Sequence, residues 1–294
     1  MPSYPFMQVD AFTDHRLGGN PCAILFDTDD LDAATMQAIA RENNLSETSF
    51  VMKSQIADVR ARYFTPATEI PLAGHPTIAT IFALVESGRL QLTGDLTTIS
   101  LELNVGPIRV DVYANGKTVQ KVVMSQKKPQ FLRVLEPEEI LPAFNLTKAD
   151  FAPNAPPQVV STGTAQLMVL LRSHDALRRL DDVNLSELRR ILASGEFFGI
   201  HFFCLQGATE QGDSFARFVV EGFEDPYTGS ATGNMGAYLW HHGLIEQPTF
   251  VAEQGHWMGR PGTGYVEVIG PRHDIETVKV GGSAVTVIRG EFVV

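Results

Sequence analysis

The 294-residue sequence has few cysteines, a deficit of basic charge and no long apolar run. It contains 23 Lys and Arg residues and 34 Asp and Glu residues, which gives a net charge of −11. Nucleic acid and anionic lipid both require basic surface, so neither is an expected partner. No apolar stretch approaches the roughly 18 residues of a membrane span, and the N-terminal residues do not resemble a signal peptide. We therefore expect a cytoplasmic protein that binds no membrane.

Cysteine is nearly absent, since only Cys22 and Cys204 occur in the chain. Each lies within an apolar, strand-like segment, where a small buried hydrophobic residue is the ordinary interpretation. A disulfide or a metal site is therefore not expected.

One stretch of the sequence occurs twice, with residues 61–88 matched by residues 216–243. Eight of the 28 ungapped positions are identical, where average residue usage gives roughly two. The identical pairs, each 155 positions apart, are Ala61/Ala216, Arg62/Arg217, Glu69/Glu224, Pro71/Pro226, Gly74/Gly229, Thr77/Thr232, Leu84/Leu239 and Gly88/Gly243. Each copy has the pattern of a strand, a polar turn with proline, and a glycine that opens an apolar helix.

This repeat predicts two copies of one domain. The alternative is that two unrelated strand-loop-helix units share a few glycines and prolines. A solenoid does not fit, because its repeats span about 20–50 residues. The length of the chain also predicts about two domains. We expect an N-terminal domain at 1–125, completed by a returning strand at 281–294, and a C-terminal domain at 126–280.

The remaining pattern indicates an α+β class with mainly antiparallel sheets. Asp30 or Asp32 can cap a helix that runs to about Asn43, and Asn115–Gly116 is a hairpin signal. Further strands are predicted near 98–104, 107–113, 118–124, 158–162, 167–171, 197–205, 264–270, 276–280 and 284–293, and helices near 136–143, 173–181 and 184–194. Hairpin-connected strands argue against a doubly wound dinucleotide-binding sheet.

The repeated glycines predict an anion site. A glycine at the start of a helix allows close approach to backbone N–H groups that have no partner within the helix. The donors would be the N–H groups of Gly74 and His75 in one copy and of Gly229 and Ser230 in the other. Two such helix starts facing one cleft could hold a carboxylate from two sides. The alternative is that both glycines only form tight turns and Ser230 only caps its helix.

The two copies differ where chemistry is expected. Ile70 and His75 in the first copy correspond to Asp225 and Ser230 in the second. Glu47 lies outside the repeat, at a junction between a predicted helix and a strand. Asp225 can also be a solvated turn residue, and Glu47 can be an ordinary surface carboxylate. The residue pattern therefore predicts a cleft and an anion site, and leaves the reaction open.

Motifs along nearly the whole chain resemble the phenazine-biosynthesis-type isomerase family, part of the broader diaminopimelate-epimerase-like fold. The matching motifs are Val9-Asp10-Ala11-Phe12-Thr13, Gly19-Asn20-Pro21, Asn44-Leu45-Ser46-Glu47-Thr48, Phe64-Thr65-Pro66, Pro71-Leu72-Ala73-Gly74-His75-Pro76-Thr77, Ser161-Thr162-Gly163, Glu224-Asp225-Pro226, Thr228-Gly229-Ser230-Ala231, Gln254-Gly255, Met258-Gly259-Arg260-Pro261 and Gly282-Ser283-Ala284-Val285.

The resemblance implies two domains related by a pseudo-twofold axis, each a barrel-like sheet around a central helix, with the active-site cleft between them. It implies that Glu47 is the general acid/base, that His75 and Asp225 assist, and that Gly74, Gly229 and Ser230 bind substrate. Backbone N–H groups would stabilise the charge that develops when a proton leaves carbon, and a carboxylate kept dry gains basicity. No metal or organic cofactor is implied, and the assembly would be a homodimer.

One departure concerns the subclass of enzyme. Epimerases and racemases of this fold use a cysteine in each half, directly before the helix-opening glycine, and this chain has Ala73 and Thr228 there. Neither can act as a base, which argues against a two-cysteine racemase. We therefore expect a cofactor-independent isomerase that shifts a proton on a small, carboxylate-bearing substrate through Glu47.

Two other functions remain open at the level of sequence. Ser230 and His75 could be the nucleophile and base of a hydrolase, although Thr228 stands where the Gly-x-Ser-x-Gly elbow requires glycine. The chain could also be a non-catalytic metabolite-binding protein of the same fold. The motifs do not identify the substrate.

Overall fold

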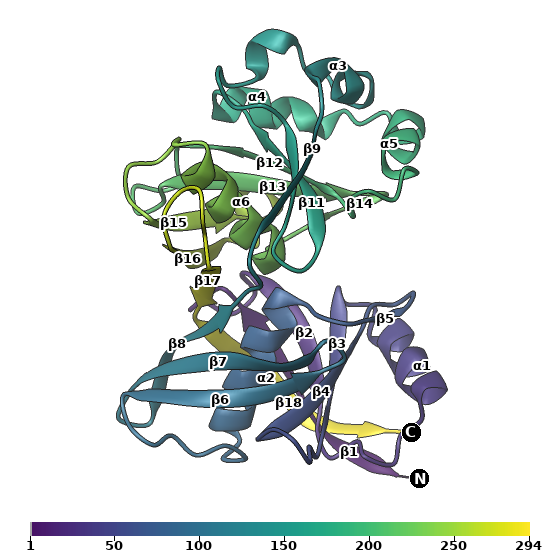
Figure 1. Ribbon diagram of the computed structural model, residues 1–294. Helices are drawn as coiled ribbons and strands as arrows, with labels where there is room; N and C mark the ends of the chain where they lie inside the picture. The colour runs from purple at the N-terminus through teal and green to yellow at the C-terminus, as the bar shows by residue number, and fades with distance from the viewer. Residues whose placement is uncertain (1) are drawn as a thin grey trace. The chain divides into compact units, whose positions relative to one another are not determined.

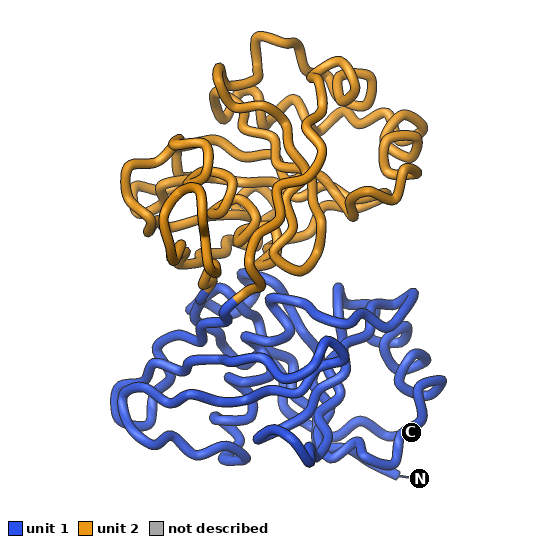
Figure 2. The backbone as a smooth tube through the Cα atoms, in the orientation of Figure 1, with its two compact units in different colours: residues 1–125, 281–294 blue, residues 126–280 orange. Residues whose placement is uncertain are grey.

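The computed structural model describes residues 2–294 and divides into two compact units (Figures 1 and 2). Unit 1 runs up to Ser125 and includes Gly281–Val294, and unit 2 is Gln126–Val280. Each unit contains its own cluster of buried apolar side chains. Within residues 2–294, no helix is both long and apolar enough to cross a membrane.

Unit 1 is a mixed sheet with two helices. Its elements are β1 (Ser3–Ala11), β2 (Asn20–Leu25), α1 (Ala33–Asn43), β3 (Glu47–Met52), β4 (Val59–Phe64), β5 (Glu69–Ile70), α2 (Gly74–Glu86), β6 (Leu96–Leu103), β7 (Gly106–Asn115), β8 (Thr118–Ser125) and β18 (Ala284–Val293). The strands pair in the order β18-β1-β2-β3-β4-β6-β7-β8, with β5 also on β4. Helix α2 packs against β1, β2 and β3 and also against the outer strands β8 and β18, so the sheet curves around it (Figure 1).

The sequence accounts for the two helices of unit 1. Asp32 caps α1 by accepting from the Thr35 N–H at 2.8 Å, and the helix ends at Asn44 in the left-handed conformation. Helix α2 is apolar on nearly all sides, and most of its side chains are buried. A helix without a polar face has to lie inside a sheet rather than on its surface.

Unit 2 has its own sheet and central helix. Its elements are β9 (Gln130–Val134), α3 (Pro137–Ile140), β10 (Gln158–Ser161), β11 (Ala165–Leu170), α4 (His174–Arg178), α5 (Leu185–Leu192), β12 (Ile200–Cys204), β13 (Ser214–Val220), β14 (Phe223–Asp225), α6 (Gly229–His241), β15 (Thr249–Gln254), β16 (Gly262–Ile269) and β17 (Thr277–Gly282), whose last two residues belong to unit 1. The strands pair in the order β9-β10-β11-β12-β13-β15-β16, with β14 also on β13. Helix α6 packs against β10, β11 and β16.

The two units therefore repeat one order of strands. Strands β1 to β7 correspond to β10 to β16, and α2 corresponds to α6. The correspondence extends to single residues, because Tyr63 pairs with Ile70 and, 155 positions later, Phe218 pairs with Asp225. The duplication in the sequence is thus a duplication of topology and register.

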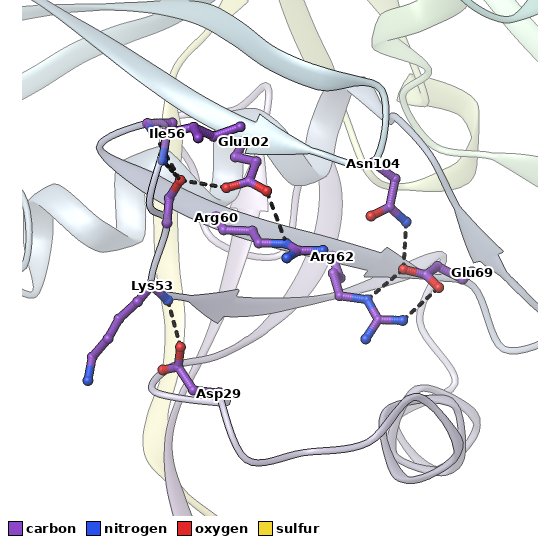
Figure 3. Close-up of polar contacts among 10 residues, drawn as sticks. Asp29, Lys53, Ile56, Arg60, Arg62, Glu69, Glu102 and Asn104 are labelled. Atoms are coloured by element: carbon purple, nitrogen blue, oxygen red, sulfur yellow. Dashed lines mark hydrogen bonds and ion pairs between the residues drawn. The ribbon is translucent and has the colours of Figure 1, made fainter.

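An Arg–Glu pair recurs at the same place in both units. Arg62 of β4 contacts Glu69 of β5 through two bonds of 2.7 and 2.8 Å, and Asn104 adds a bond to the same carboxylate (Figure 3). In unit 2, Arg217 contacts Glu224 through two bonds of 3.0 and 2.5 Å. Each pair fixes the turn that leads into the central helix.

Three details differ from the predictions. The sheets are mainly antiparallel, as predicted, but they also contain the parallel pairs β2–β3, β4–β6, β11–β12 and β13–β15. These pairs are joined by longer connections instead of hairpins, as parallel strands require. The strand predicted at 197–205 begins at Ile200, and the helix predicted at 173–181 divides into α4 and a 3-10 turn.

Candidate active site

The unit 1 candidates Glu47 and His75 are in direct contact. Glu47 Oε2 lies 3.0 Å from His75 Nε2, and the two side chains are 16% and 5% exposed. Glu47 is the first residue of β3 and His75 the second residue of α2. A residue at a strand end and one at a helix start, 28 positions apart in sequence, are therefore brought together by the packing of α2 on the sheet.

The His75 ring is neutral at pH 7. Burial lowers the pKa of His75 to about 3, because the interior disfavours the charged ring. Its Nδ1 lies 3.2 Å from the side-chain nitrogen of Asn20, the first residue of β2. When the Asn20 amide donates to Nδ1, the ring hydrogen is on Nε2 and faces Glu47. With a neutral ring, the 3.0 Å approach of Glu47 and His75 is a close polar contact rather than an ion pair.

The Glu47 carboxylate lies beside a buried thiol. Its cross-strand partner is Cys22, which is fully buried. Burial first, and then the Glu47 carboxylate, raise the pKa of the Cys22 thiol well above its usual range. In unit 2 the register places Gly199 at the equivalent position, because Thr48 pairs with Phe64 and Ile200 pairs with Val219. The acid/base candidate therefore has no carboxylate counterpart in unit 2.

The two central helices begin differently from the others. In α1, α4 and α5 an Asp, Ser or Asn side chain caps the first turn. In α2 and α6 the preceding residues are Ala73 and Thr228, and in the described chain neither side chain caps the helix. Thr77 and Thr232 instead hydrogen bond back to the carbonyls of these residues, at 2.8 and 3.0 Å. The first N–H groups of both helices are left available to an anion.

The unit 2 candidate Asp225 is buried in β14, at 8% exposure. Its carboxylate accepts from the Thr228 hydroxyl, and its carbonyl accepts from Gln254 Nε2 at 2.7 Å. Gly255 follows Gln254 with φ +81°, and a Cβ there would lie 2.5 Å from the Pro226 carbonyl. Only glycine fits this close approach. Because Asp225 is buried and both its carboxylate and its carbonyl accept hydrogen bonds, the alternative prediction of a solvated turn residue is wrong.

Ser230 is the second residue of α6 and does not cap it, since the capping position belongs to Thr228. The Ser230 oxygen accepts a hydrogen bond of 2.9 Å from Gln166 Nε2 of β11. Gly229 precedes it as the first residue of the helix, and its carbonyl accepts from Gln126 at 2.9 Å. Both substrate-binding candidates of unit 2 are thus held by buried amide side chains.

Sequence reasoning missed the amides that support the candidates. The sequence motifs assign no role to Asn20, and no motif singles out Gln126, Gln166 or Asn234. Their signal is an amide inside an otherwise apolar element, such as Asn234 within α6 or Gln166 within β11. Buried amides need hydrogen-bond partners, so such positions indicate a polar network.

Comparisons with known proteins identify the family of the chain. A family model described as phenazine biosynthesis-like protein (PhzC-PhzF) matches residues 9–290. An uncharacterized isomerase, YddE of Salmonella typhimurium, is 36% identical, and the alignment covers 97% of both chains. The trans-2,3-dihydro-3-hydroxyanthranilate isomerase of Pseudomonas fluorescens is 34% identical, with 98% of this chain and 99% of the relative covered.

Solved structures give the same result for the fold. A phenazine biosynthesis protein of the PhzF family from Bacillus anthracis has a TM-score of 0.88 at 30% identity, with 100% of both chains covered. A hydroxyproline epimerase from Agrobacterium vitis has a TM-score of 0.67 at 12% identity, over 98% of this chain and 92% of the epimerase. At that identity the likeness concerns the fold alone.

Proposed function

This chain is an isomerase of the PhzF family, and we propose that it shifts a proton on a small, carboxylate-bearing substrate with Glu47 as the general acid/base. The observation that carries this proposal is the contact between Glu47 and a neutral, buried His75 beside the uncapped start of α2. A carboxylate that is largely withdrawn from water, in contact with an uncharged ring, is suited to exchange a proton with carbon.

The proposed reaction is a proton transfer between two carbons. The Glu47 carboxylate takes a proton from a carbon next to a carboxylate or carbonyl, and the electron pair of that C–H bond enters the adjacent π system. The carboxylic acid formed on Glu47 then returns the proton to another carbon of the same system. No atom or electron is lost or gained, and no oxidant or reductant is required.

The charge that develops on oxygen during this transfer needs donors. Backbone N–H groups of Gly74 and His75 are candidates in unit 1, and those of Gly229 and Ser230 in unit 2. Oriented N–H groups at helix starts stabilise such charge without reorganisation. Asp225, buried and hydrogen-bonded, is proposed to assist at the substrate. The cleft formed by the two units and the homodimer both stay predictions.

The substrate class follows from the donors and from the relatives. Helix starts without acidic residues in the first turn favour an anion. One relative acts on trans-2,3-dihydro-3-hydroxyanthranilate, an unsaturated ring carboxylate. We propose an unsaturated small carboxylic acid of this kind, in which a double bond can move together with the proton.

Replacement of Glu47 tests the proposal. Glu47→Gln keeps the shape of the side chain and removes the base, so we expect turnover to fall by about 10²–10⁴-fold. The assay follows bond position and deuterium content by NMR in deuterated water, with trans-2,3-dihydro-3-hydroxyanthranilate first in the substrate panel. Glu102→Gln, a carboxylate of the same unit that contacts Arg60 (Figure 3), is the matched control. Equal rates in wild type and Glu47→Gln would remove Glu47 from the mechanism.

The hydrolase alternative is disfavoured by the same contacts. His75 Nε2 faces Glu47, and a ring with a pKa of about 3 is a poor general base at pH 7. Family membership also favours an active isomerase over a protein that only binds metabolites.

A further inference from the structure

A row of buried polar side chains runs through unit 2 and ends at the Ser230 hydroxyl. Its members are Gln126, Thr162, Asn234, Gln166 and Ser230. The first four are between 0% and 7% exposed, and Ser230 is half-buried. Unpaired amides are costly in such surroundings, so the network has to be satisfied by its own members.

The backbone fixes which way the Asn234 amide points. Its oxygen accepts from the Thr162 N–H at 2.7 Å, and its nitrogen donates to the Thr164 carbonyl at 2.9 Å. A flipped amide would set an N–H group against the Thr162 N–H and an oxygen against the Thr164 carbonyl. Since a backbone donor stays a donor and a carbonyl stays an acceptor, only one orientation is possible.

This orientation is passed on to Gln166. The Asn234 amide nitrogen donates to Gln166 Oε1, so Gln166 presents its nitrogen to Ser230 and donates at 2.9 Å. The Ser230 oxygen is therefore an acceptor within the protein, and its hydrogen points away from Gln166. A hydroxyl held in this way can donate to a ligand.

The other end of the row is fixed as well. Gln126 donates to the Gly229 carbonyl at 2.9 Å, and its oxygen lies beside the Thr162 hydroxyl, whose one hydrogen is shared with Asn234 Oδ1. A Cβ on Gly233 would lie 1.9 Å from the Gln126 oxygen, so a glycine in α6 makes room for this amide. The start of α6 is thus locked at both Gly229 and Ser230.

We propose that Gln166, oriented by Asn234, is a positioning residue that makes the Ser230 hydroxyl a hydrogen-bond donor to an anionic oxygen of the ligand. This inference rests on the proposed function, since it concerns the same carboxylate-bearing substrate. The preference of the site for a carboxylate over an amide then depends on a buried residue. Either oxygen of a carboxylate can accept the hydrogen of the Ser230 hydroxyl, whereas an amide has one neutral oxygen and an N–H group that cannot accept it.

Benzoate and benzamide are the probes, because they have the same shape and differ in the charge and donors of the head group. Dissociation constants are measured by calorimetry for both. We expect wild type to bind benzoate about 10- to 100-fold more tightly than benzamide. Gln166→Glu presents an acceptor to Ser230 and turns its hydrogen inward, so this preference should be lost. A residue with only a structural role would weaken both probes equally.

Four further variants make the test decisive. Gln166→Met removes the donor without adding charge and should reduce the preference several-fold. Ser230→Ala should reduce it to the share that the backbone N–H groups supply, and Gln166→Glu should then have little added effect in the Ser230→Ala background. Gln158→Glu changes another buried glutamine of unit 2, outside the row, and should keep the preference.

The outcomes separate this inference from the proposed function. Absence of benzoate preference in wild type, an unchanged preference in both Gln166 variants, or an undiminished Gln166→Glu effect without Ser230 would each overturn the inference. Glu47→Gln should keep the benzoate preference while it loses turnover. Turnover retained in Glu47→Gln would instead overturn the proposed proton transfer and leave the role of Ser230 standing.

Discussion

At the scale of single residues, buried histidines mark two different environments in the two units. His75 contacts Asn20 and Glu47, whereas His201 on β12 is fully buried with no hydrogen-bond partner for either ring nitrogen among residues 2–294. The rings of Phe203 and Phe218 lie beside it. By register His201 corresponds to Ser49, which accepts a hydrogen bond from Thr80.

His201 should make the protein sensitive to acid. Burial lowers the pKa of His201 to about 3, against about 6.5 in an unfolded chain. Between these values the unfolded chain binds the proton first, so the free energy of unfolding is greatest above pH 6.5 and falls as the pH drops towards 3.

His201→Leu should therefore reduce the loss of stability between pH 7.5 and pH 5.0 by roughly 2 kcal/mol. Urea unfolding at the two pH values measures this difference. The exposed His273→Gln is the control and should behave as wild type. An identical pH dependence in His201→Leu and wild type would show that His201 is not the source of the acid sensitivity.

At the scale of elements, the turn before each central helix is held by an Arg–Glu pair. The pair in unit 2 is more deeply buried than the equivalent pair in unit 1. The Arg217 side chain is 10% exposed and also contacts the Leu177 carbonyl at 2.9 Å and Asp181 at 2.7 Å. Arg62 is more exposed, with 18% of its side chain accessible. Glu224 directly precedes Asp225, so the pair in unit 2 also fixes a site candidate.

Loss of Arg217 should cost more than loss of Arg62. Arg217→Met leaves the Glu224 carboxylate partly buried without its partner, and we expect a loss of about 3 kcal/mol in unfolding free energy. Arg62→Met should cost less, because water reaches that pair more easily. Replacing both partners, as Arg217→Met with Glu224→Gln, should recover part of the loss in urea unfolding. Equal costs for the two arginine variants would contradict this ranking.

At the scale of the whole molecule, unit 1 depends on a strand from the other end of the chain. β18 pairs with β1 from Ser3 opposite Val293 to Ala11 opposite Ala284, and it also packs against α2. Without it, β1 would keep β2 on one side and lose its partner on the other.

A chain that ends at Val280 should therefore lose structure in unit 1 before unit 2. Hydrogen exchange should show fast exchange in β1 and β2 and retained protection in β12 and β13. A chain that ends at Gly290 keeps most of the pairing and is the control. Protection of β1 equal to that of the full chain would mean that the returning strand is dispensable.

The sequence by itself determined the α+β class, the repeat, the family and the capped start of α1, because these depend on local patterns and on spacing along the chain. The family and the class are confirmed by the comparisons. The roles of Glu47, His75, Asp225, Gly74, Gly229 and Ser230 stay predictions. The parallel pairs within each sheet were not predicted. Alternation of apolar and polar residues identifies a strand, but it does not show which strand lies beside it or in which direction that neighbour runs.

Only the tertiary structure decided what surrounds each candidate. It brought Glu47 to His75, buried Asp225, and made Ser230 an acceptor from Gln166 rather than a helix cap. These contacts join residues that are 28 to 64 positions apart, so no local pattern encodes them. The direction of the Gln166–Ser230 hydrogen bond is set by the Thr162 N–H and the Thr164 carbonyl, which orient Asn234. These backbone groups meet Asn234 only once the chain has folded.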